Sequence, residues 1–383
     1  MTHQALTQPI ERRRGAVARG RVDRTLPLIV ALLLMCGLTA LFSATYYQAI
    51  HRGDPLLEVK RQLIGVGLGL GLMLITMRVP YAFWGKPSVA VTGLALSVAL
   101  LVIVLVPGIG VYRNGSRRWL NLAGLSFQPS ELAKLAVVNY LATTLAFKPI
   151  ERDRFLRGVL PLLIIPAIFF LLILQQPNLS TAGSVLIVSL LFLLMAGVKW
   201  RHLAVLGVSG LAVGFAYAWS APYRRERLLS FRDPFAQMSD DGYQLAQSLI
   251  AIGSGGLFGR GLGQGRQKFS FLPYPESDFI FAIVGEDFGL FGCVVVISLF
   301  VALLLAGMRI ALNCPDRFGC FLAAGITAMI SVQAFINIGV VAGVLPTTGL
   351  PLPFFSAGGT SVTLLLGAVG IVLNVSRGRS LAP

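Results

Sequence analysis

Long apolar stretches dominate this sequence and constrain its fold more than any other feature. Hydrophobic residues make up 55% of the 383 positions and charged residues only 13%, about half the charge of an ordinary soluble domain. A helix needs about 20 residues to cross the hydrocarbon core of a bilayer. The sequence therefore predicts an all-α, polytopic membrane protein with about ten transmembrane helices: Thr25–Ala44, Gln62–Thr76, Pro87–Val106, Pro129–Phe147, Leu156–Leu174, Thr181–Val198, His202–Trp219, Asp278–Met308, Phe318–Val344 and Gly359–Ser376.

The basic residues indicate how these spans are oriented. An even number of spans places both ends of the chain on one side. That side carries more of the 32 Lys and Arg residues, as the cytoplasmic side usually does, so both termini are predicted to be cytoplasmic. The same distribution accounts for the net charge of +16, and no nucleic-acid partner is expected. The predicted organisation is a basic N-terminal tail (1–24), one membrane domain (25–376) and a short C-terminal tail (377–383).

The second span is short and rich in glycine. It carries Gly65, Gly67, Gly69 and Gly71. These form two overlapping small-xxx-small pairs, a pattern that lets two helices approach closely. The span is therefore predicted to pack tightly against another helix.

A loop of residues 220–277 separates the seventh and eighth spans and is predicted to be extracytoplasmic. Loops this long in compact proteins are usually functional. Within it, Gly242–Ile252 is predicted to form a short helix at the membrane interface, with Gln247 and Ser248 on its polar face. The glycine-rich stretch 253–265 follows. It is either a flexible re-entrant segment or a loop that approaches a diphosphate.

Three polar segments on the predicted outer side could carry chemistry, and the first lies at the start of the fourth span. Arg117 and Arg118 precede the span, and Glu131 and Lys134 lie three residues apart in its first turns, where they can pair. Two interpretations remain open. The pair is a structural ion pair, or Arg117, Arg118 and Lys134 line an anionic head-group site, since guanidinium groups match phosphate oxygens.

The second segment leads into the eighth span. Asp278 lies where the polar loop enters an apolar helix, and a carboxylate there is costly, so it is a functional candidate unless it only caps the helix. Glu286 lies about 12 Å further along the helix, too far for the paired carboxylates of a retaining glycosidase. Glu276 and Asp278 could together hold a divalent cation (Mg or Mn), although two carboxylates alone are a weak indication.

The third segment, residues 343–361, lies between the last two spans. It contains three prolines and several glycines, together with Ser356. Irregular backbone at membrane depth is tolerated only where protein or a polar cavity surrounds it. The segment is therefore predicted to form the wall of a cleft.

Together these segments resemble the SEDS family (shape, elongation, division and sporulation), which includes the FtsW and RodA polymerases. GSRRWLNLAGLSFQPSELAKL is similar to the family's loop and fourth-span signature, SDFIFAIVGEDFG to its eighth span, and GVLPTTGLPLPFFSAGGTS to its final motif. The resemblance covers nearly the whole chain, and its glycine-rich loop favours the FtsW branch. The chain departs from the family pattern at Glu276 and Ser277, where His-Thr is common. It also departs at Asn178 and Ser180, in a motif usually written QPDLGTA, and at Ala357, where Tyr is common.

The resemblance implies a peptidoglycan glycosyltransferase that polymerises lipid II at the outer face of the bacterial cytoplasmic membrane during cell division. Asp278 would be the catalytic general base of an inverting transfer. The expected partners are a class B penicillin-binding transpeptidase and other membrane proteins of the divisome. The expected substrate-binding residues are Arg117, Arg118, Gln128, Ser130, Glu131, Lys134, Arg266, Lys268, Ser356, Gly358 and Gly359.

A lipid II flippase and a non-catalytic scaffold of the division complex remain as alternatives. A transporter needs polar groups near the middle of the membrane, whereas the spans carry few charges, chiefly Glu131, Lys134, Glu286 and Asp287. An intact Asp278 argues modestly against a scaffold. The sequence leaves open the role in division, elongation or sporulation, the metal requirement, the identity of the transpeptidase, and which basic residues bind the diphosphate.

Overall fold

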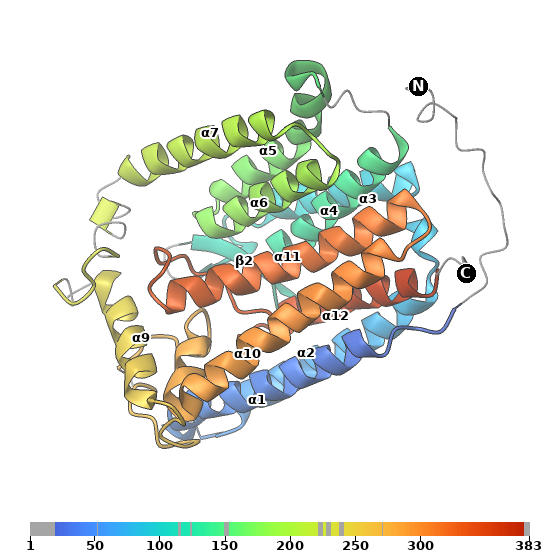
Figure 1. The fold of residues 1–383 in the computed structure, drawn as a ribbon. Coiled ribbons are helices and arrows are strands. Elements are labelled where there is room, and N and C mark those ends of the chain that lie inside the picture. Colours follow the sequence, from blue (N-terminus) through green and yellow to red (C-terminus); the bar gives the residue numbers. More distant parts are fainter. Residues whose placement is uncertain are drawn as a thin grey trace.

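A computed structural model of the chain describes residues 20–51, 53–113, 116–122, 125–148, 153–220, 225–226, 231–236, 241–269 and 271–378. Its helices run side by side in one bundle, with a small sheet and a long loop at one end (Figure 1). The helices of the bundle are α1 (Thr25–His51), α2 (Leu57–Arg78), α3 (Pro87–Ile103), α4 (Pro129–Phe147), α5 (Leu160–Leu174), α6 (Leu179–Met195), α7 (Trp200–Trp219), α10 (Ile280–Leu312), α11 (Arg317–Val341) and α12 (Gly359–Ser376). A short 3-10 helix, η1 (Tyr81–Phe83), follows α2, and a π-helical turn, η2 (Phe155–Val159), leads into α5.

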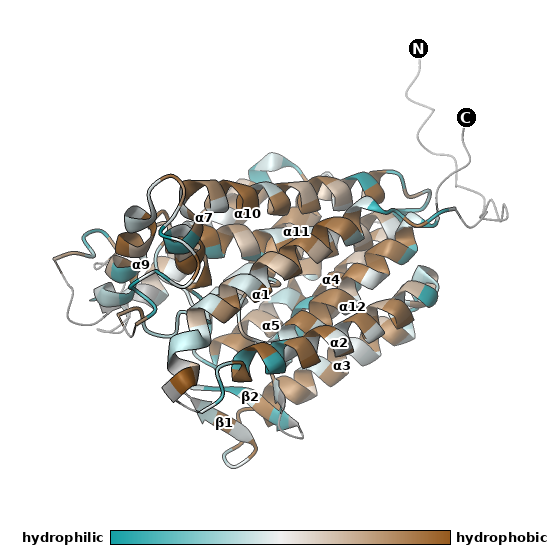
Figure 2. Ribbon diagram, turned by 90° about the horizontal axis from the view of Figure 1, so that it is seen from below, coloured by the Kyte–Doolittle hydropathy of each residue, from teal (hydrophilic) through white to brown (hydrophobic). Residues whose placement is uncertain are grey.

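A helix occupies each of the ten predicted spans. Among the described residues, six helices are long and apolar enough to cross a membrane: α1, α2, α5 with η2, α10, α11 and α12. Helices α3 and α6 are apolar but shorter. The helix surfaces are largely apolar (Figure 2), and α2 exposes Leu63, Leu68 and Ile75, as expected of residues that face lipid. The chain is a multi-pass membrane protein, and the number of ten spans stays a prediction.

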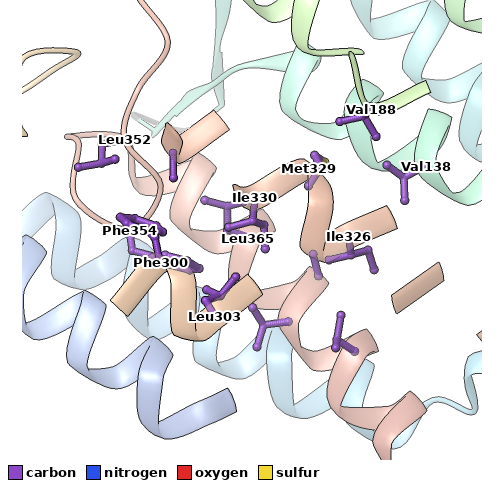
Figure 3. Close-up of a cluster of buried hydrophobic side chains, with 14 of the residues drawn as sticks. Val138, Val188, Phe300, Leu303, Ile326, Met329, Ile330, Leu352, Phe354 and Leu365 are labelled. Atoms are coloured by element: carbon purple, nitrogen blue, oxygen red, sulfur yellow. The ribbon is translucent and has the colours of Figure 1, made fainter. Parts of the chain in front are cut away.

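The hydrophobic core is centred on α11. Figure 3 shows side chains from four other helices and one loop meeting those of α11. Such interlocking positions each helix relative to its neighbours, because protein interiors are close-packed. The labelled residues are Val138 of α4, Val188 of α6, Phe300 and Leu303 of α10, Ile326, Met329 and Ile330 of α11, Leu365 of α12, and Leu352 and Phe354 of the loop before α12.

Helix α2 packs tightly against α12, as its glycines predicted. A Cβ atom added at Gly65 would lie 2.4 Å from the Cα atom of Gly359, and one added at Gly69 would lie 2.6 Å from the Leu366 side chain. Gly67 has no atom of another element within 4 Å of such a Cβ atom. Of the two predicted pairs, Gly65 and Gly69 therefore form the contact, and the other pair points away from α12.

The two ends of the described chain meet at one end of the bundle. The Gly20 N–H donates to the Arg377 carbonyl at 2.8 Å, and the Asp23 N–H donates to Ser376 Oγ at 3.1 Å. An even number of crossings produces this arrangement. Both ends lying on one side agrees with the topology predicted from the sequence, whereas the cytoplasmic identity of that side stays a prediction. Most of the basic N-terminal tail, and residues 379–383, lie outside the described residues.

A three-stranded antiparallel sheet connects α3 to α4. Its strands β1 (Gly110–Arg113), β2 (Ser116–Leu122) and β3 (Leu125–Phe127) lie in the order β1-β2-β3. The sequence analysis did not predict this sheet. Thr360 Oγ1 at the start of α12 donates to the Ser126 carbonyl of β3 at 2.7 Å. The sheet is thereby fixed to the end of the bundle opposite Gly20 and Arg377.

The long loop contains the predicted helix, observed as α9 (Asp241–Gly255). The helix packs against α10 and α11, and both Gln247 and Ser248 are buried. Ser248 Oγ donates to the Val341 carbonyl at the end of α11 at 2.8 Å. The predicted polar face therefore points into the protein rather than into water. One hydroxyl satisfies a helix-end carbonyl that would otherwise be unpaired.

Candidate active site

A buried ion pair begins α4. Lys134 Nζ lies 2.8 Å from Glu131 Oε1, and both side chains are almost fully buried. Lys134 also donates to the Gln333 side-chain carbonyl of α11, and Ser361 Oγ of α12 donates to Glu131 Oε2 at 3.2 Å. The predicted pairing is confirmed. The pair joins three helices at the sheet end of the bundle.

Two amides on α11 connect this pair to the predicted catalytic carboxylate. Gln333 and Asn337 are four residues apart and so lie on one face of the helix. The Gln333 amide donates to the Pro351 carbonyl at 2.9 Å, whereas the Asn337 amide donates to the carbonyls of Leu350 and Asp278, both at 2.7 Å. Lys134 and Asp278, distant in sequence, are thus brought to adjacent turns of α11.

Asp278 lies in the turn immediately before α10, which begins at Ile280 rather than at Asp278 as predicted. Its side chain is partly exposed, while the neighbouring Phe279 is 1% exposed. A Cβ atom added at Gly349 would lie 3.6 Å from Asp278 Oδ2, so this carboxylate faces the irregular segment before α12. Asp278 is therefore partly exposed beside a buried Phe279, an arrangement that holds its backbone in position and leaves the residue accessible to a ligand.

The segment between α11 and α12, residues 342–358, is irregular, as predicted. Ser356 Oγ accepts from the Leu352 N–H at 2.8 Å, which closes a turn within the segment. Gln62 of α2 donates to the Ser356 carbonyl at 3.2 Å and accepts from the Gly358 N–H at 3.1 Å. Gly359 begins α12 against Gly65. Ser356, Gly358 and Gly359 therefore shape the segment and its junction with α12.

The two arginines of β2 have different surroundings. Arg118 Nε donates to the Gln176 carbonyl at 2.9 Å, and its terminal nitrogen donates to the Pro177 carbonyl, both in the turn between α5 and α6. Arg117 lies over the Tyr112 ring, 5.8 Å from its centroid. Arg118 therefore links the sheet to the α5–α6 turn. Gln128 is the residue immediately before α4, at the end of the segment that leads from the sheet into this helix.

Five of the twelve buried side-chain polar atoms that have no hydrogen-bond partner among the described residues belong to the segments of this region. They are located on α4, on α11, in the turn between α5 and α6, and in the segment before α12. Buried polar groups are usually paired, so a group of unpaired ones indicates a polar ligand or water. These atoms are Ser130 Oγ, Gln176 Oε1, Asn337 Oδ1, Thr347 Oγ1 and Thr348 Oγ1.

Gln333 and Asn337 were missed by sequence reasoning. Both lie inside an apolar run that was read only as a span. Their spacing was the available signal, because two amides four residues apart on one face of a spanning helix are costly unless they bind something.

Two of the expected diphosphate ligands, Lys268 and Arg266, make contacts with other parts of the chain. Lys268 is 2% exposed, and its Nζ atom lies 3.0 Å from Asp287 Oδ1 and 2.7 Å from Ser43 Oγ of α1. The Arg266 side chain is exposed, and its backbone N–H donates to Glu286. Lys268 thus forms a buried ion pair with Asp287 rather than joining the Glu131–Lys134 pair. We therefore leave Lys268 and Arg266 out of the candidate site.

The expected divalent cation finds no additional support. Among the described residues, no group of three or more His, Cys, Asp and Glu side chains comes together. The Glu276 carbonyl accepts from the Ala357 N–H at 2.8 Å, which fixes the backbone before Asp278. A cation at Glu276 and Asp278 stays an untested expectation.

Comparison with known proteins identifies the family of this chain. Residues 24–381 match the FtsW/RodA/SpoVE family, described as cell cycle proteins. The chain belongs to this family. The match confirms the SEDS resemblance, since it covers nearly all of the chain and includes every segment of the candidate site.

The relatives come from more than one branch of the family. The chain is 44% identical to stage V sporulation protein E of Bacillus subtilis, over 93% of this chain and 97% of that protein. It is 40% identical to the probable peptidoglycan glycosyltransferase FtsW of Geobacter metallireducens, over 91% and 93% of the two chains. The preference for the FtsW branch therefore stays a prediction.

Solved structures of family members have the same fold. One of them, described as "Structural coordination of polymerization and crosslinking by a peptidoglycan synthase complex", has a TM-score of 0.76, with 31% identity over 94% of this chain and 99% of that one. The crystal structure of RodA from Thermus thermophilus has a TM-score of 0.67, with 30% identity over 94% and 98% of the two chains.

Proposed function

We propose that this chain is a peptidoglycan glycosyltransferase that polymerises lipid II at the outer face of the bacterial cytoplasmic membrane. The observation that carries the proposal is the position of Asp278. A partly exposed carboxylate lies at the end of a membrane bundle, one turn of α11 from the buried Glu131–Lys134 pair. Relatives named as probable peptidoglycan glycosyltransferases and a peptidoglycan synthase complex of the same fold support the same activity.

In the proposed reaction, Asp278 acts as a general base. It removes the proton from the 4-hydroxyl of one precursor, and that oxygen attacks the anomeric carbon of the lipid-linked growing strand. The bond from this carbon to the diphosphate breaks, and undecaprenyl diphosphate leaves. A single displacement inverts the anomeric configuration. Asp278 retains the proton until it passes to solvent, which its exposed position allows.

The departing diphosphate needs positive charge nearby. Lys134 is suited to this task because an ammonium group has three donors, and the described residues supply two acceptors, Glu131 and Gln333. Arg117 and Arg118 lie on the sheet that covers the same end of the bundle. We assign the leaving-group side of the site to these three residues.

The sugar rings offer many hydroxyl and amide groups. The unpaired polar atoms at Ser130, Asn337, Thr347 and Thr348 are suited to bind them, because each would otherwise remain buried without a partner. The undecaprenyl tail is expected to remain in the bilayer beside the apolar helices. A class B penicillin-binding transpeptidase is the proposed partner, since a polymerase of this kind needs a separate enzyme to crosslink its product.

Purified protein tests this function directly. The protein, alone and with a co-purified transpeptidase, is incubated with fluorescently labelled lipid II, and the products are separated by gel electrophoresis. A ladder of glycan strands is expected, and Asp278→Asn should form it at least about a hundredfold more slowly. A protein that moves lipid II between leaflets of a vesicle, yet makes no glycan with or without the transpeptidase, would be a flippase instead. Neither activity would indicate a scaffold.

A further inference from the structure

Helix α10 is interrupted at Gly289, which has a φ of 65° and a ψ of −160°. The sequence analysis expected one continuous span here. In a continuous helix, the N–H groups of Leu290 and Phe291 would donate to the carbonyls of Glu286 and Asp287. The interruption breaks both bonds, and it separates the segment 280–288, which follows Asp278, from the long spanning part of α10.

The loop before the site replaces the missing bonds. Leu290 and Phe291 donate instead to the carbonyls of Gly256 and Leu257, at 2.9 and 3.1 Å. In return, the Arg260 N–H donates to the Glu286 carbonyl at 3.0 Å, and the Gly261 N–H donates to the Asp287 carbonyl at 3.1 Å. These four backbone groups of α10 are all paired with residues 256–261.

Glycines make this close contact sterically feasible. A Cβ atom added at Gly259 would lie 2.1 Å from the Asp287 carbonyl oxygen, and one at Gly255 would lie 1.9 Å from that of Gly285. No side chain fits at these distances. The glycine-rich stretch therefore packs on the interruption in α10. This supports neither the flexible re-entrant segment nor the diphosphate loop considered from the sequence.

Two buried acids strengthen the same contact. Glu286 is 0% exposed, and its Oε1 atom accepts from the backbone N–H groups of Arg266 and Gln267, at 2.5 and 3.2 Å. Asp287 is 1% exposed and pairs with Lys268, while Ser43 of α1 donates to its other oxygen. Carboxylates buried at this depth are expensive and are retained when they do something specific.

We infer that Glu286 and the Asp287–Lys268 pair are positioning residues for Asp278. They fix the segment 280–288 to the loop 255–268 and to α1, so that this segment is oriented independently of the spanning part of α10. Asp278 lies two residues before Ile280, the first residue of this segment, and the Asp278 carbonyl accepts from the Asn337 amide. We call these contacts of Glu286, Asp287 and Lys268 the clamp. The position of the Asp278 carboxylate relative to α11 therefore depends on the clamp, and this inference rests on the proposed function. Misplacing a reacting group by about 1 Å can cost a hundredfold in rate.

The test compares Glu286→Ala with Glu286→Gln. The glutamine keeps a side-chain oxygen that can accept from Arg266 and Gln267, whereas the alanine removes it. We expect Glu286→Ala to lower kcat at least about tenfold with KM for lipid II changed less than about twofold, and Glu286→Gln to recover most of the loss. Asp54→Ala is the matched control, because Asp54 is a partly exposed acid at the same end of the bundle, paired with Lys60. It should leave kcat unchanged.

A second measurement detects the clamp without an activity assay. Hydrogen–deuterium exchange should accelerate at least about tenfold in residues 280–288 of Glu286→Ala but stay unchanged in residues 295–312. If Glu286→Ala fails to fold, Glu286→Asp replaces it, since the shorter side chain cannot reach both N–H groups. Unchanged exchange in 280–288, or a lowered thermal stability with full kcat, would overturn the inference. If the wild type makes no glycan, the proposed function fails, and the exchange experiment still decides whether the clamp exists.

Discussion

The side chain of Asp278 belongs to a turn that is fixed from both directions. Ala357 donates to the carbonyl two residues before it, and Asn337 donates to its own carbonyl. The residue itself remains partly exposed. A general base needs this combination, because its position must be reproducible while its proton must still reach solvent.

Replacement of Asp278 by asparagine keeps the size and hydrogen bonding of the side chain and removes its basicity. General-base catalysis contributes roughly 10²–10⁴-fold in rate, so Asp278→Asn should polymerise lipid II at least about a hundredfold more slowly. Initial rates of glycan synthesis measure this, and the thermal unfolding temperature of the variant should match that of the wild type. Near-normal rates would mean that Asp278 serves only to start the helix.

The Glu131–Lys134 pair can be tested for the two roles that the sequence left open. Glu131→Gln leaves the Lys134 charge buried without its partner, which should destabilise the protein by about 3–5 kcal/mol. The double variant Glu131→Gln with Lys134→Gln removes both charges and should recover most of this stability. Thermal unfolding in detergent measures both.

Polymerisation by the double variant then separates the two roles. If Lys134 contacts the leaving diphosphate, glycan synthesis stays low although the protein is stable again. A double variant that regains both stability and activity would identify the pair as purely structural.

Among the helices, the contact of α2 with α12 offers a matched comparison between glycines of one helix. A Cβ atom at Gly65 would overlap Gly359, whereas one at Gly67 would meet nothing within 4 Å. Gly65→Ala should therefore destabilise the protein by about 1–3 kcal/mol through overpacking. Gly67→Ala should be neutral or stabilising by up to about 1 kcal/mol, because alanine favours the helix. Thermal unfolding of the two variants side by side tests the contact, and equal effects would contradict it.

Helix positions could be predicted from the sequence because hydropathy over about 20 residues depends little on tertiary context. The smaller elements could not. The strands of the sheet are three to seven residues long, too short for a period-two pattern to stand out. Gly289 lies within an apolar run, which predicts a continuous helix. Its actual conformation depends on contacts with a loop about 30 residues earlier in the chain. The polar face of α9 was assigned to water because amphipathicity alone does not say which side is protein.

In the candidate site, too, some features could be predicted from the sequence and others could not. Asp278, Glu131 and Lys134 were predicted because charges in an apolar context are conspicuous. The pairing of Lys268 with Asp287 could not be predicted, because the two residues are 19 positions apart and meet only through the fold.

For the molecule as a whole, the predicted orientation can be measured by labelling. Single cysteines are placed at Arg154 and Arg225, both exposed, in a protein from which the four native cysteines have been removed. An impermeant maleimide added to intact cells should label position 225 and not position 154, because the two lie on opposite sides of the predicted membrane. Labelling of both from outside would show that the number of crossings between them is wrong.

The hydrogen bond between Gly20 and Arg377 also has a consequence for engineering. Since the described chain closes on itself within 2.8 Å, residues 20 and 377 could be joined by a few glycines and the backbone opened elsewhere. An opening in the loop after α7 would create new ends on the opposite face of the membrane. Such a circular permutant would carry a fluorescent or affinity tag beside the candidate site, on a bundle whose helix contacts are unchanged.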